Sequence, residues 1–314
     1  MRAVVIPGFG VEPEIADLPV PSPATDEILV RVHAAGMNPF DWKVIDGALR
    51  GVVDHPFPLV MGSDGAGVVE AVGADVERFR PGDRVYGQFM KVARGLGSYA
   101  EFTLAPDAGK LALVPEDLAF TVAAALPTAS VTAYQAIEEA RLDPGRTILV
   151  NGASGGVGQS AIQFAADTGA RVIATGPPDL ADHLRELGAA EVVDFTAGPT
   201  AEQVLAAHPD GIDAVLDLVS RPGQADALVD LLRPGGVVIS TNGAVDADAL
   251  AARELRGVNF SSNATPEALA AIAELAVTGR LRVTIDAEVP LEEAPAAVAR
   301  ARAGHARGKT VIVV

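Results

Sequence analysis

The sequence has no cysteine among its 314 residues, and only 4% of them are aromatic. Without cysteine the chain can form no disulfide, no thiol nucleophile and no zinc site with thiolate ligands. Its five histidines are spread along the sequence without the spacing that metal ligands show. The composition therefore argues against thiol and metal chemistry.

Basic residues are also scarce, with 24 Lys and Arg against 41 Asp and Glu and a formal net charge of −17. Nucleic-acid binding needs clustered Lys and Arg, so this balance argues against such a partner and indicates a soluble surface. No uninterrupted apolar run approaches the ~18 residues that a membrane-spanning helix needs. Residues 1–7 lack the apolar core and cleavage site of a secretory signal, so we expect a cytoplasmic protein.

What the sequence does contain is the pattern of a globular protein long enough for two domains. Hydrophobic residues make up 49% and charged residues 21%. Residues 28–34 and 67–73 alternate in the manner of strands, and Pro81-Gly82 marks a tight turn before another strand. Short strands and regular turns through residues 1–118 predict a partly open β-barrel.

From about residue 119 strands alternate with helices, which predicts a parallel, doubly wound sheet covered on both faces. The predicted strands are residues 147–151, 171–174, 191–194, 213–218, 236–240 and 257–260. After a predicted helix over residues 266–278, the last helix and strand do not extend this sheet. We therefore expect an α/β protein with a first domain of residues 1–118, completed by 282–314, and a second domain of residues 119–281.

The run from Asn151 to Gln159 reads Asn-Gly-Ala-Ser-Gly-Gly-Val-Gly-Gln. It follows the apolar segment 147–150 and precedes a predicted helix, which is the context of a dinucleotide-binding loop. Glycines let backbone N–H groups approach a pyrophosphate, and the helix N-terminus adds the positive end of a dipole. Tight turns use glycine for steric reasons alone, but the flanking strand and helix favour dinucleotide binding.

Several further motifs occur in a characteristic order. They are Gly-Met-Asn-Pro-Phe-Asp at 36–41, the glycine-rich segment 58–69, Pro-Gly-Asp-Arg-Val-Tyr-Gly at 81–87, Ala-Leu-Pro at 125–127, Thr-Ala-Tyr at 132–134, the glycine loop, and 304–309. Together they resemble the medium-chain dehydrogenase/reductase superfamily, and within it the zinc-independent quinone oxidoreductase (zeta-crystallin-like) branch. The resemblance covers nearly the whole chain.

This resemblance implies a GroES-like barrel joined to a Rossmann domain, with the active site in the cleft between them. It also implies a homodimer that pairs the edge strands of two Rossmann domains near residues 258–261. The zinc alcohol dehydrogenases of the superfamily carry a zinc-binding Cys where this chain has Asn38, and a His-Glu pair where it has Ser63 and Asp64. Their proton-relay hydroxyl is replaced by Phe40, so the resemblance implies an enzyme without zinc.

Asn38 and Lys43 are the candidate catalytic residues. The resemblance places Asn38 and Asp41 near the nicotinamide and substrate; alternatively both fix a turn entering a helix, which we favour for Asp41. Lys43 stands where many quinone oxidoreductases have a tyrosine, and its ammonium either stabilises a developing enolate or is merely solvated. Trp42, the single tryptophan, either flanks a flat ligand or packs in the core.

The cofactor-binding residues come from the glycine loop, from the carboxyl ends of the predicted strands and from the resemblance. Plain alternatives exist for three of them: a buried helical threonine at 132, a turn asparagine at 242 and a solvated lysine at 309. The full predicted set is Asn38, Thr132, Gly152, Ala153, Ser154, Gly155, Gly156, Val157, Gly158, Thr175, Gly176, Asn242 and Lys309.

The end of the second Rossmann strand bears on the choice of cofactor. NAD-specific sites have an acid ~20 residues after the glycine loop that binds the ribose 2′-hydroxyl. Here Thr175 and Gly176 are followed by two prolines, with no carboxylate until Asp179. This favours NADPH by removing repulsion of the 2′-phosphate, and His183 and Arg185 are the nearby cations.

The sequence thus predicts an NADPH-dependent, zinc-independent reductase that transfers hydride to quinones or α,β-unsaturated carbonyl compounds. Its partners would be a small-molecule substrate and a second copy of the chain, with no metal, nucleic acid or membrane. Two alternatives stay open: an enoyl-thioester reductase of the same superfamily, and a non-catalytic NADPH-binding structural or regulatory protein.

Overall fold

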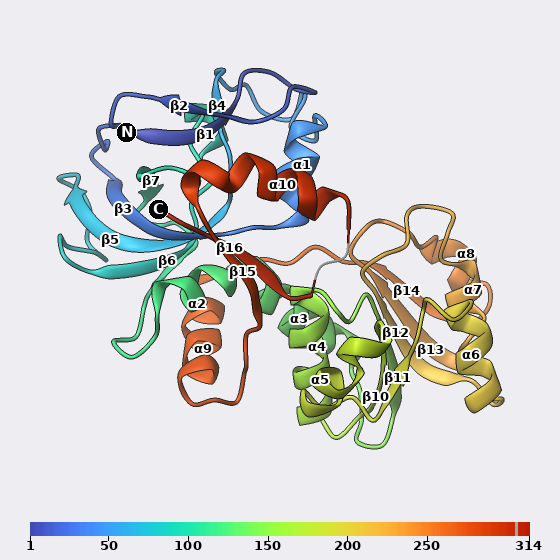
Figure 1. Ribbon diagram of the computed structural model, residues 1–314. Helices are drawn as coiled ribbons and strands as arrows, with labels where there is room; N and C mark the ends of the chain where they lie inside the picture. Colours follow the sequence, from blue (N-terminus) through green and yellow to red (C-terminus); the bar gives the residue numbers. More distant parts are fainter. Residues whose placement is uncertain (305–306) are drawn as a thin grey trace. The chain divides into compact units, whose positions relative to one another are not determined.

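A computed structural model describes residues 1–304 and 307–314. It divides the chain into two compact units, one of Met1–Ala129 with Ala264–Val314 and the other of Ser130–Asn263 (Figure 1). Within the described residues, no helix combines the length and apolarity that crossing a membrane requires. Each unit is built around its own sheet.

The unit Ser130–Asn263 holds a six-stranded parallel sheet in the order β11-β10-β9-β12-β13-β14. Its strands are β9 (Thr147–Asn151), β10 (Arg171–Thr175), β11 (Glu191–Val193), β12 (Ile212–Asp217), β13 (Leu232–Ser240) and β14 (Arg256–Asn259). Every pair is parallel. The doubly wound parallel sheet predicted from alternating strands and helices is confirmed.

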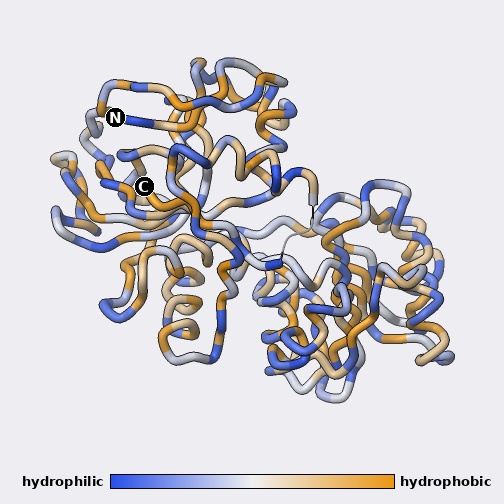
Figure 2. The backbone as a smooth tube through the Cα atoms, viewed as in Figure 1, coloured by the Kyte–Doolittle hydropathy of each residue, from blue (hydrophilic) through white to orange (hydrophobic). Residues whose placement is uncertain are grey.

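Helices cover both faces of this sheet because its strands are apolar on both sides. In β9, Ile148 and Val150 pack in one core and Leu149 packs in another, as the period of two requires. The helices are α3 (Pro127–Ala140), α4 (Gly156–Asp167), α5 (Ala181–Glu186), α6 (Thr200–Ala207), α7 (Asp226–Val229) and α8 (Ala247–Ala251). The first three face the Ile148 core and the last three the Leu149 core. In Figure 2 the central strands are mostly orange, the colour of hydrophobic residues.

The strand predicted over residues 236–240 begins earlier than the sequence pattern indicates. β13 already starts at Leu232, so the preceding helix α7 covers only Asp226–Val229. The apolar run at 228–232 thus contains the end of α7 and the start of β13. The sequence does not reveal this boundary, because so short an apolar run has no period that distinguishes a helix from a buried strand.

The other unit is mainly antiparallel. A seven-stranded sheet follows the order β15-β16-β3-β5-β6-β8 with β7 added on β3, and a three-stranded sheet follows β2-β1-β4. The strands are β1 (Arg2–Ile6), β2 (Glu14–Asp17), β3 (Glu27–Gly36), β4 (Leu59–Val60), β5 (Asp64–Val72), β6 (Arg84–Gln88), β7 (Phe102–Pro106), β8 (Leu111–Leu113), β15 (Ile285–Pro290) and β16 (Lys309–Val313). These sheets form the barrel that the turn pattern predicts, and it is the GroES-like domain that the resemblance implies.

Helices of this unit are α1 (Pro39–Ile45), α2 (Phe120–Ala125), α9 (Pro266–Val277) and α10 (Ala294–Arg302). Helix α2 lies so close to β3 that a Cβ on Gly36 would come within 2.1 Å of the Ala124 carbonyl oxygen. The Tyr86 hydroxyl on β6 donates to the carbonyl of Leu269 on α9. Helices α2 and α9 therefore belong to the barrel unit. The sequence pattern instead predicted domain boundaries at residues 118 and 282, which would assign both helices to the second domain.

The C-terminal strand returns to the first part of the chain. β16 pairs antiparallel with β3, with Val311 opposite Gly36, and parallel with β15. This pairing brings Lys309, at the start of β16, to the end of β3, where Asn38 follows two residues later.

Candidate functional site

The glycine loop joins β9 to α4 as the sequence predicts. Gly152 has a φ of +89°, a left-handed conformation that favours glycine. A Cβ on Gly158 would lie 2.4 Å from the Gly152 carbonyl oxygen, so this residue allows close packing of helix on loop. A Cβ on Gly155 would meet only that same oxygen, at 3.8 Å. The space beside Gly155 is therefore open to a ligand.

Helix α4 begins in that open space without a side-chain cap. Its N-cap residue is Gly155, which has no side chain to accept hydrogen bonds from the N–H groups of the first turn. The N–H groups of the first turn have no partner inside a helix, and they carry the positive end of the dipole. An uncapped, glycine-lined helix start of this kind fits the pyrophosphate of a dinucleotide.

Other predicted loop residues contribute structure. Ala153 is fully buried in the core beneath the sheet, and Val157 packs against the same core. The carbonyl of Ser154 accepts a 2.8 Å hydrogen bond from Gln159 Nε2. Gly156 is the first residue of α4. Ala153, Ser154 and Val157 thus shape the loop, while Gly155 and Gly156, at the start of α4, lie where a ligand fits.

Thr175 and Gly176 close the loop against the next strand. Thr175 Oγ1 accepts a 2.9 Å hydrogen bond from the Gly152 N–H. A Cβ on Gly176 would come within 2.5 Å of Leu184 Cδ1, so the chain has no room for a side chain there. No carboxylate stands at the end of β10, and His183 Nε2 lies 3.0 Å from Gln159 Oε1.

Sequence reasoning missed Asp217, which ends β12 at the point where the strand order reverses. Its Oδ1 accepts hydrogen bonds from Asn151 Nδ2 at 2.9 Å and from the N–H groups of Val219 and Ser220 at 3.1 Å. Its Oδ2 is buried and has no partner among the described residues. Ligands of open α/β sheets bind at this reversal. An acid directly after a buried strand was the available signal.

Thr132 and Asn242 each bond to their own unit. Thr132 Oγ1 lies 2.8 Å from Ser262 Oγ. Asn242 Nδ2 donates to the carbonyl of Leu218 at 3.0 Å, just beyond the end of β12. Their predicted contacts with a cofactor stay predictions.

In the barrel unit, five polar side chains form a buried cluster. They are Asn38, Asp41, Asp64, Tyr99 and Lys309, each at most 5% exposed. Lys309 Nζ donates to Asn38 Oδ1 at 2.6 Å and to the Met37 carbonyl at 2.5 Å. The alternative of a solvated lysine is thus wrong, because pairing of β16 with β3 carries Lys309 into the interior.

Asp41 holds Asn38 in place from the first turn of α1. Asp41 Oδ2 accepts from the Asn38 N–H at 2.7 Å and from the Tyr99 hydroxyl at 2.5 Å, while Oδ1 is buried without a partner among the described residues. Burial raises the pKa of Asp41 to about 7, although both hydrogen bonds oppose the shift. Burial and the Asp41 charge likewise raise the pKa of Tyr99. Asp41 therefore acts as the structural residue we favoured.

Asp64 completes the cluster and interacts electrostatically with Lys309. Its two oxygens accept from Thr128 Oγ1 at 2.7 Å and from the Thr128 N–H at 2.8 Å. Burial raises the pKa of Asp64, while the charge of Lys309 and hydrogen bonds from Thr128 and Asn38 oppose the rise. Burial lowers the pKa of Lys309, and the charges of Asp64 and Asp41 oppose that change. The cluster thus depends on one buried ammonium between two buried carboxyl groups.

Lys43 and Trp42 follow on α1 but face elsewhere. The buried residues of α1 are Asp41, Val44 and Ile45, whereas Lys43 lies on the exposed side. Trp42 packs partly against the apolar core of this unit. The proposed role of Lys43 at a developing enolate stays a prediction.

No group of three or more His, Asp or Glu side chains that could hold a metal occurs within residues 1–304 and 307–314. In the 304–309 motif, His305 and Ala306 lie outside the described residues.

Comparisons with known proteins agree with this architecture. The family model of the alcohol dehydrogenase GroES-like domain matches residues 24–116, and that of the zinc-binding dehydrogenase matches residues 187–312. The chain is 34% identical over 305 residues to the 2-methylene-furan-3-one reductase of Solanum lycopersicum, covering 95% of this chain and 74% of that protein. It is 32% identical over 331 residues to the chloroplastic quinone-oxidoreductase homolog of Spinacia oleracea, covering 99% and 98%.

Another relative and a solved structure extend the likeness. The chloroplastic NADPH-dependent alkenal/one oxidoreductase of Arabidopsis thaliana is 31% identical over 305 residues, covering 95% of this chain and 74% of that protein. The structure of the quinone oxidoreductase from Coxiella burnetii matches with a TM-score of 0.89 and 30% identity, over 100% of this chain and 99% of that chain. The predicted resemblance is confirmed: the chain belongs to the medium-chain dehydrogenase/reductase superfamily, as an oxidoreductase of the zinc-independent quinone oxidoreductase type.

Proposed function

We propose that this protein reduces quinones or α,β-unsaturated carbonyl compounds with NADPH and without a metal. Relatives named as quinone and alkenal/one oxidoreductases support the substrate class. The observation that carries the proposal is the uncapped start of α4 beside Gly155, where a Cβ would meet no atom closer than 3.8 Å. Its N–H groups would hold the pyrophosphate.

When bound at this helix start, the dinucleotide would supply hydride to an electrophilic carbon, and the acceptor would also take up a proton from solvent or a side chain. On the protein side, the buried cluster supplies charge stabilisation. Lys309 uses two ammonium N–H bonds on Met37 and Asn38, and the third is available for an oxygen that gains negative charge. A fixed charge in a dry environment stabilises a developing oxyanion more strongly than one in water.

The preference for NADPH over NADH rests on the end of β10. Thr175 is occupied by the glycine loop, and Gly176 has no room for a side chain, so no acid can bind a 2′-hydroxyl or repel a 2′-phosphate there. His183 and Arg185 on α5 are the basic residues that follow this turn. The Arabidopsis thaliana relative, named as an NADPH-dependent enzyme, supports the same preference.

A spectrophotometric assay tests the proposal directly. NADPH absorbance is followed with the purified chain and a panel of quinones, enones, enoyl thioesters and primary alcohols, and NADH is compared in parallel. We expect NADPH oxidation with quinones or enones. Binding of NADPH without oxidation by any acceptor would instead support a non-catalytic protein, and turnover confined to enoyl thioesters would support the alternative enzyme.

We also propose a homodimer formed through β14. This strand is the edge of the parallel sheet and leaves one row of backbone groups unpaired within the unit. Pairing of two such edges would continue the sheet across the dimer. Light scattering should give twice the mass of the chain; a monomeric mass at assay concentrations would contradict the proposal.

A further inference from the structure

The unit Ser130–Asn263 has a hollow of about 330 Å³ at the edge of the sheet opposite the glycine loop. It lies near the amino ends of β9, β12 and β14, where Arg146 precedes β9, Asp213 is the second residue of β12 and Arg256 is the first of β14; Pro234 to Gly236 of β13 also line it. β9 is five residues long and spans ~15 Å. The hollow is therefore separate from the place where a dinucleotide fits.

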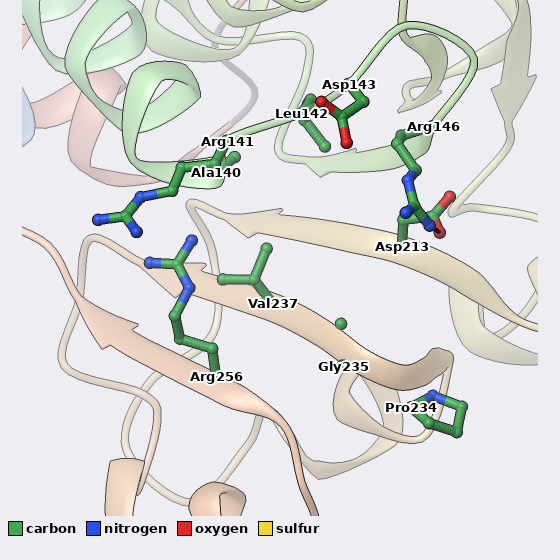
Figure 3. A pocket seen from close by; sticks show the side chains of 11 residues that line it. Ala140, Arg141, Leu142, Asp143, Arg146, Asp213, Pro234, Gly235, Val237 and Arg256 are labelled. Atoms are coloured by element: carbon green, nitrogen blue, oxygen red, sulfur yellow. Dashed lines mark hydrogen bonds and ion pairs between the residues drawn. The ribbon is translucent and has the colours of Figure 1, made fainter.

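Three arginines lie around this hollow in a chain with a net charge of −17. Figure 3 shows the guanidinium groups of Arg141 and Arg256 pointing toward one another, and Asp143 on the opposite side. Arg146 instead pairs with Asp213 at 2.9 Å. Two guanidinium groups that face each other repel, and here the Glu139 carboxylate pairs with Arg256 but not with Arg141.

Arg141 is the residue least explained by local structure. It follows the last residue of α3 with a φ of +53°, a position where helices commonly carry glycine because other residues are strained there. Its guanidinium has no hydrogen-bond or ion-pair partner in the part of the chain that the structure describes. The strained backbone thus carries a cation whose five donors are unused.

Arg256 offers further donors beside it. Its Nη1 bonds the Glu139 carboxylate and its Nη2 bonds the Glu139 carbonyl, which holds the planar group in place on β14. Three of its five N–H donors stay free of these bonds. A fixed guanidinium loses little entropy when it binds, and its fork matches carboxylate and phosphate oxygens.

We propose that this hollow binds a small anion bearing carboxylate or phosphate oxygens, held between Arg141 and Arg256. Leu142, Pro234 and Val237 provide an apolar wall for the body of an organic anion. The Asp143 carboxylate would repel the charged end of this anion, so that end would lie toward the two arginines. This site depends on no cofactor, so it stands or falls independently of the proposed reductase activity.

Calorimetric titration of the full chain with inorganic phosphate and, separately, citrate tests the site at constant ionic strength. The two arms distinguish a phosphate ligand from a polycarboxylate. The test variant is Arg141→Gly, because glycine suits a φ of +53° and the fold should be kept. The matched control is Arg171→Gln, which removes the same charge from an exposed pair with Glu191 outside the hollow.

At least one anion should bind the native chain, and Arg141→Gly should weaken it by about tenfold or more, the loss expected for a charge-assisted contact. Arg141→Lys should restore part of the affinity, while Arg171→Gln should leave it unchanged. Equal affinity in the native chain and Arg141→Gly would overturn the site. The anion would then bind elsewhere, such as at the glycine loop, or be an adventitious ion only. Absence of binding by both anions would overturn it equally.

Discussion

Asp41 is the residue whose protonation most affects the buried cluster. One of its oxygens accepts hydrogen bonds from Tyr99 and the Asn38 N–H, and the other is buried without a partner among the described residues. Burial raises its pKa from 3.8 to about 7. The folded protein therefore binds a proton here that the unfolded chain releases above its ordinary pKa, and folding is penalised as the pH rises through that window.

We expect Asp41→Asn to flatten this pH dependence. The amide oxygen can accept both hydrogen bonds but carries no charge, so the variant should gain stability over the native chain as pH rises from about 4 to 7, at ~1.4 kcal/mol per pKa unit. Thermal melts at about pH 5 and pH 8 measure it. The exposed Asp182→Asn serves as control; parallel pH profiles of native chain and Asp41→Asn would show that Asp41 is not the group responsible.

Lys309→Met tests the buried ammonium. Removing it leaves Asp64 and Asp41 without their counter-charge, so the pKa of Asp64 should rise further and the Asn38 side chain should lose its partner. We expect kcat to fall by roughly 10²-fold, as for loss of an oxyanion-stabilising group, with a smaller change in the dissociation constant of NADPH. Lys110→Met, at an exposed lysine, should retain activity. A variant that loses NADPH binding but keeps kcat would assign Lys309 to the cofactor instead.

At the scale of elements, the glycines of the loop have two roles, in folding and in ligand binding. The sequence alone does not show which glycine has which role. Gly152 and Gly158 are needed by the fold, since one is left-handed and a Cβ on the other would collide with the loop backbone. Gly155 has ordinary backbone angles, with φ −81° and ψ 170°, and an open side. Substitution at Gly155 therefore reports on ligand binding with little change in folding.

We expect Gly155→Leu to weaken NADPH binding by about tenfold or more, because its side chain would fill the space that a pyrophosphate needs. Its melting temperature should match that of the native chain, whereas Gly158→Leu should be destabilised. Fluorescence titration with NADPH, beside Gly198→Leu as a control in open space, measures the difference. Native affinity in a folded Gly155→Leu protein would remove the basis of the cofactor assignment.

At the scale of the whole molecule, composition decides the chemistry that is open to the enzyme. The full sequence has no cysteine, and Asn38, Ser63 and Asp64 occupy the positions that carry zinc ligands in zinc alcohol dehydrogenases. In this protein Asn38 is bonded to Lys309 and Asp64 to Thr128. Asn38 and Asp64 therefore already have hydrogen-bond partners within the protein.

Activity should therefore survive exhaustive chelation, and elemental analysis should find no stoichiometric zinc. Primary alcohols should be poor substrates because no Lewis acid lowers the alcohol pKa, whereas conjugated acceptors delocalise the incoming charge. The control is a zinc alcohol dehydrogenase treated identically. Loss of activity on chelation, restored by zinc together with turnover of simple alcohols, would overturn the metal-independent mechanism.

The sequence by itself determined the barrel and the parallel sheet, the glycine loop and the family. Strand periods, turn residues and motif order are local properties, so Ile148, Leu149 and Val150 predict a strand buried on both faces before any contact is known. Only the tertiary structure decided which distant residues meet. Lys309 and Asn38 are 271 residues apart, and only the pairing of β16 with β3 joins them.

The same limit applies to Tyr99 and Thr128, whose roles no local pattern marks, and to the partners of Asp217, although the acid at the end of a buried strand was a local signal. Their partners Asp41, Asp64 and Asn151 lie on other elements, and the raised pKa of Asp41 comes from burial, which depends on the whole packed unit. The boundaries at residues 129 and 263 likewise follow from the packing of α2 and α9 on the barrel. Periodicity specifies an element, but only packing specifies its neighbours, because contacts between elements are not encoded in the spacing along either one.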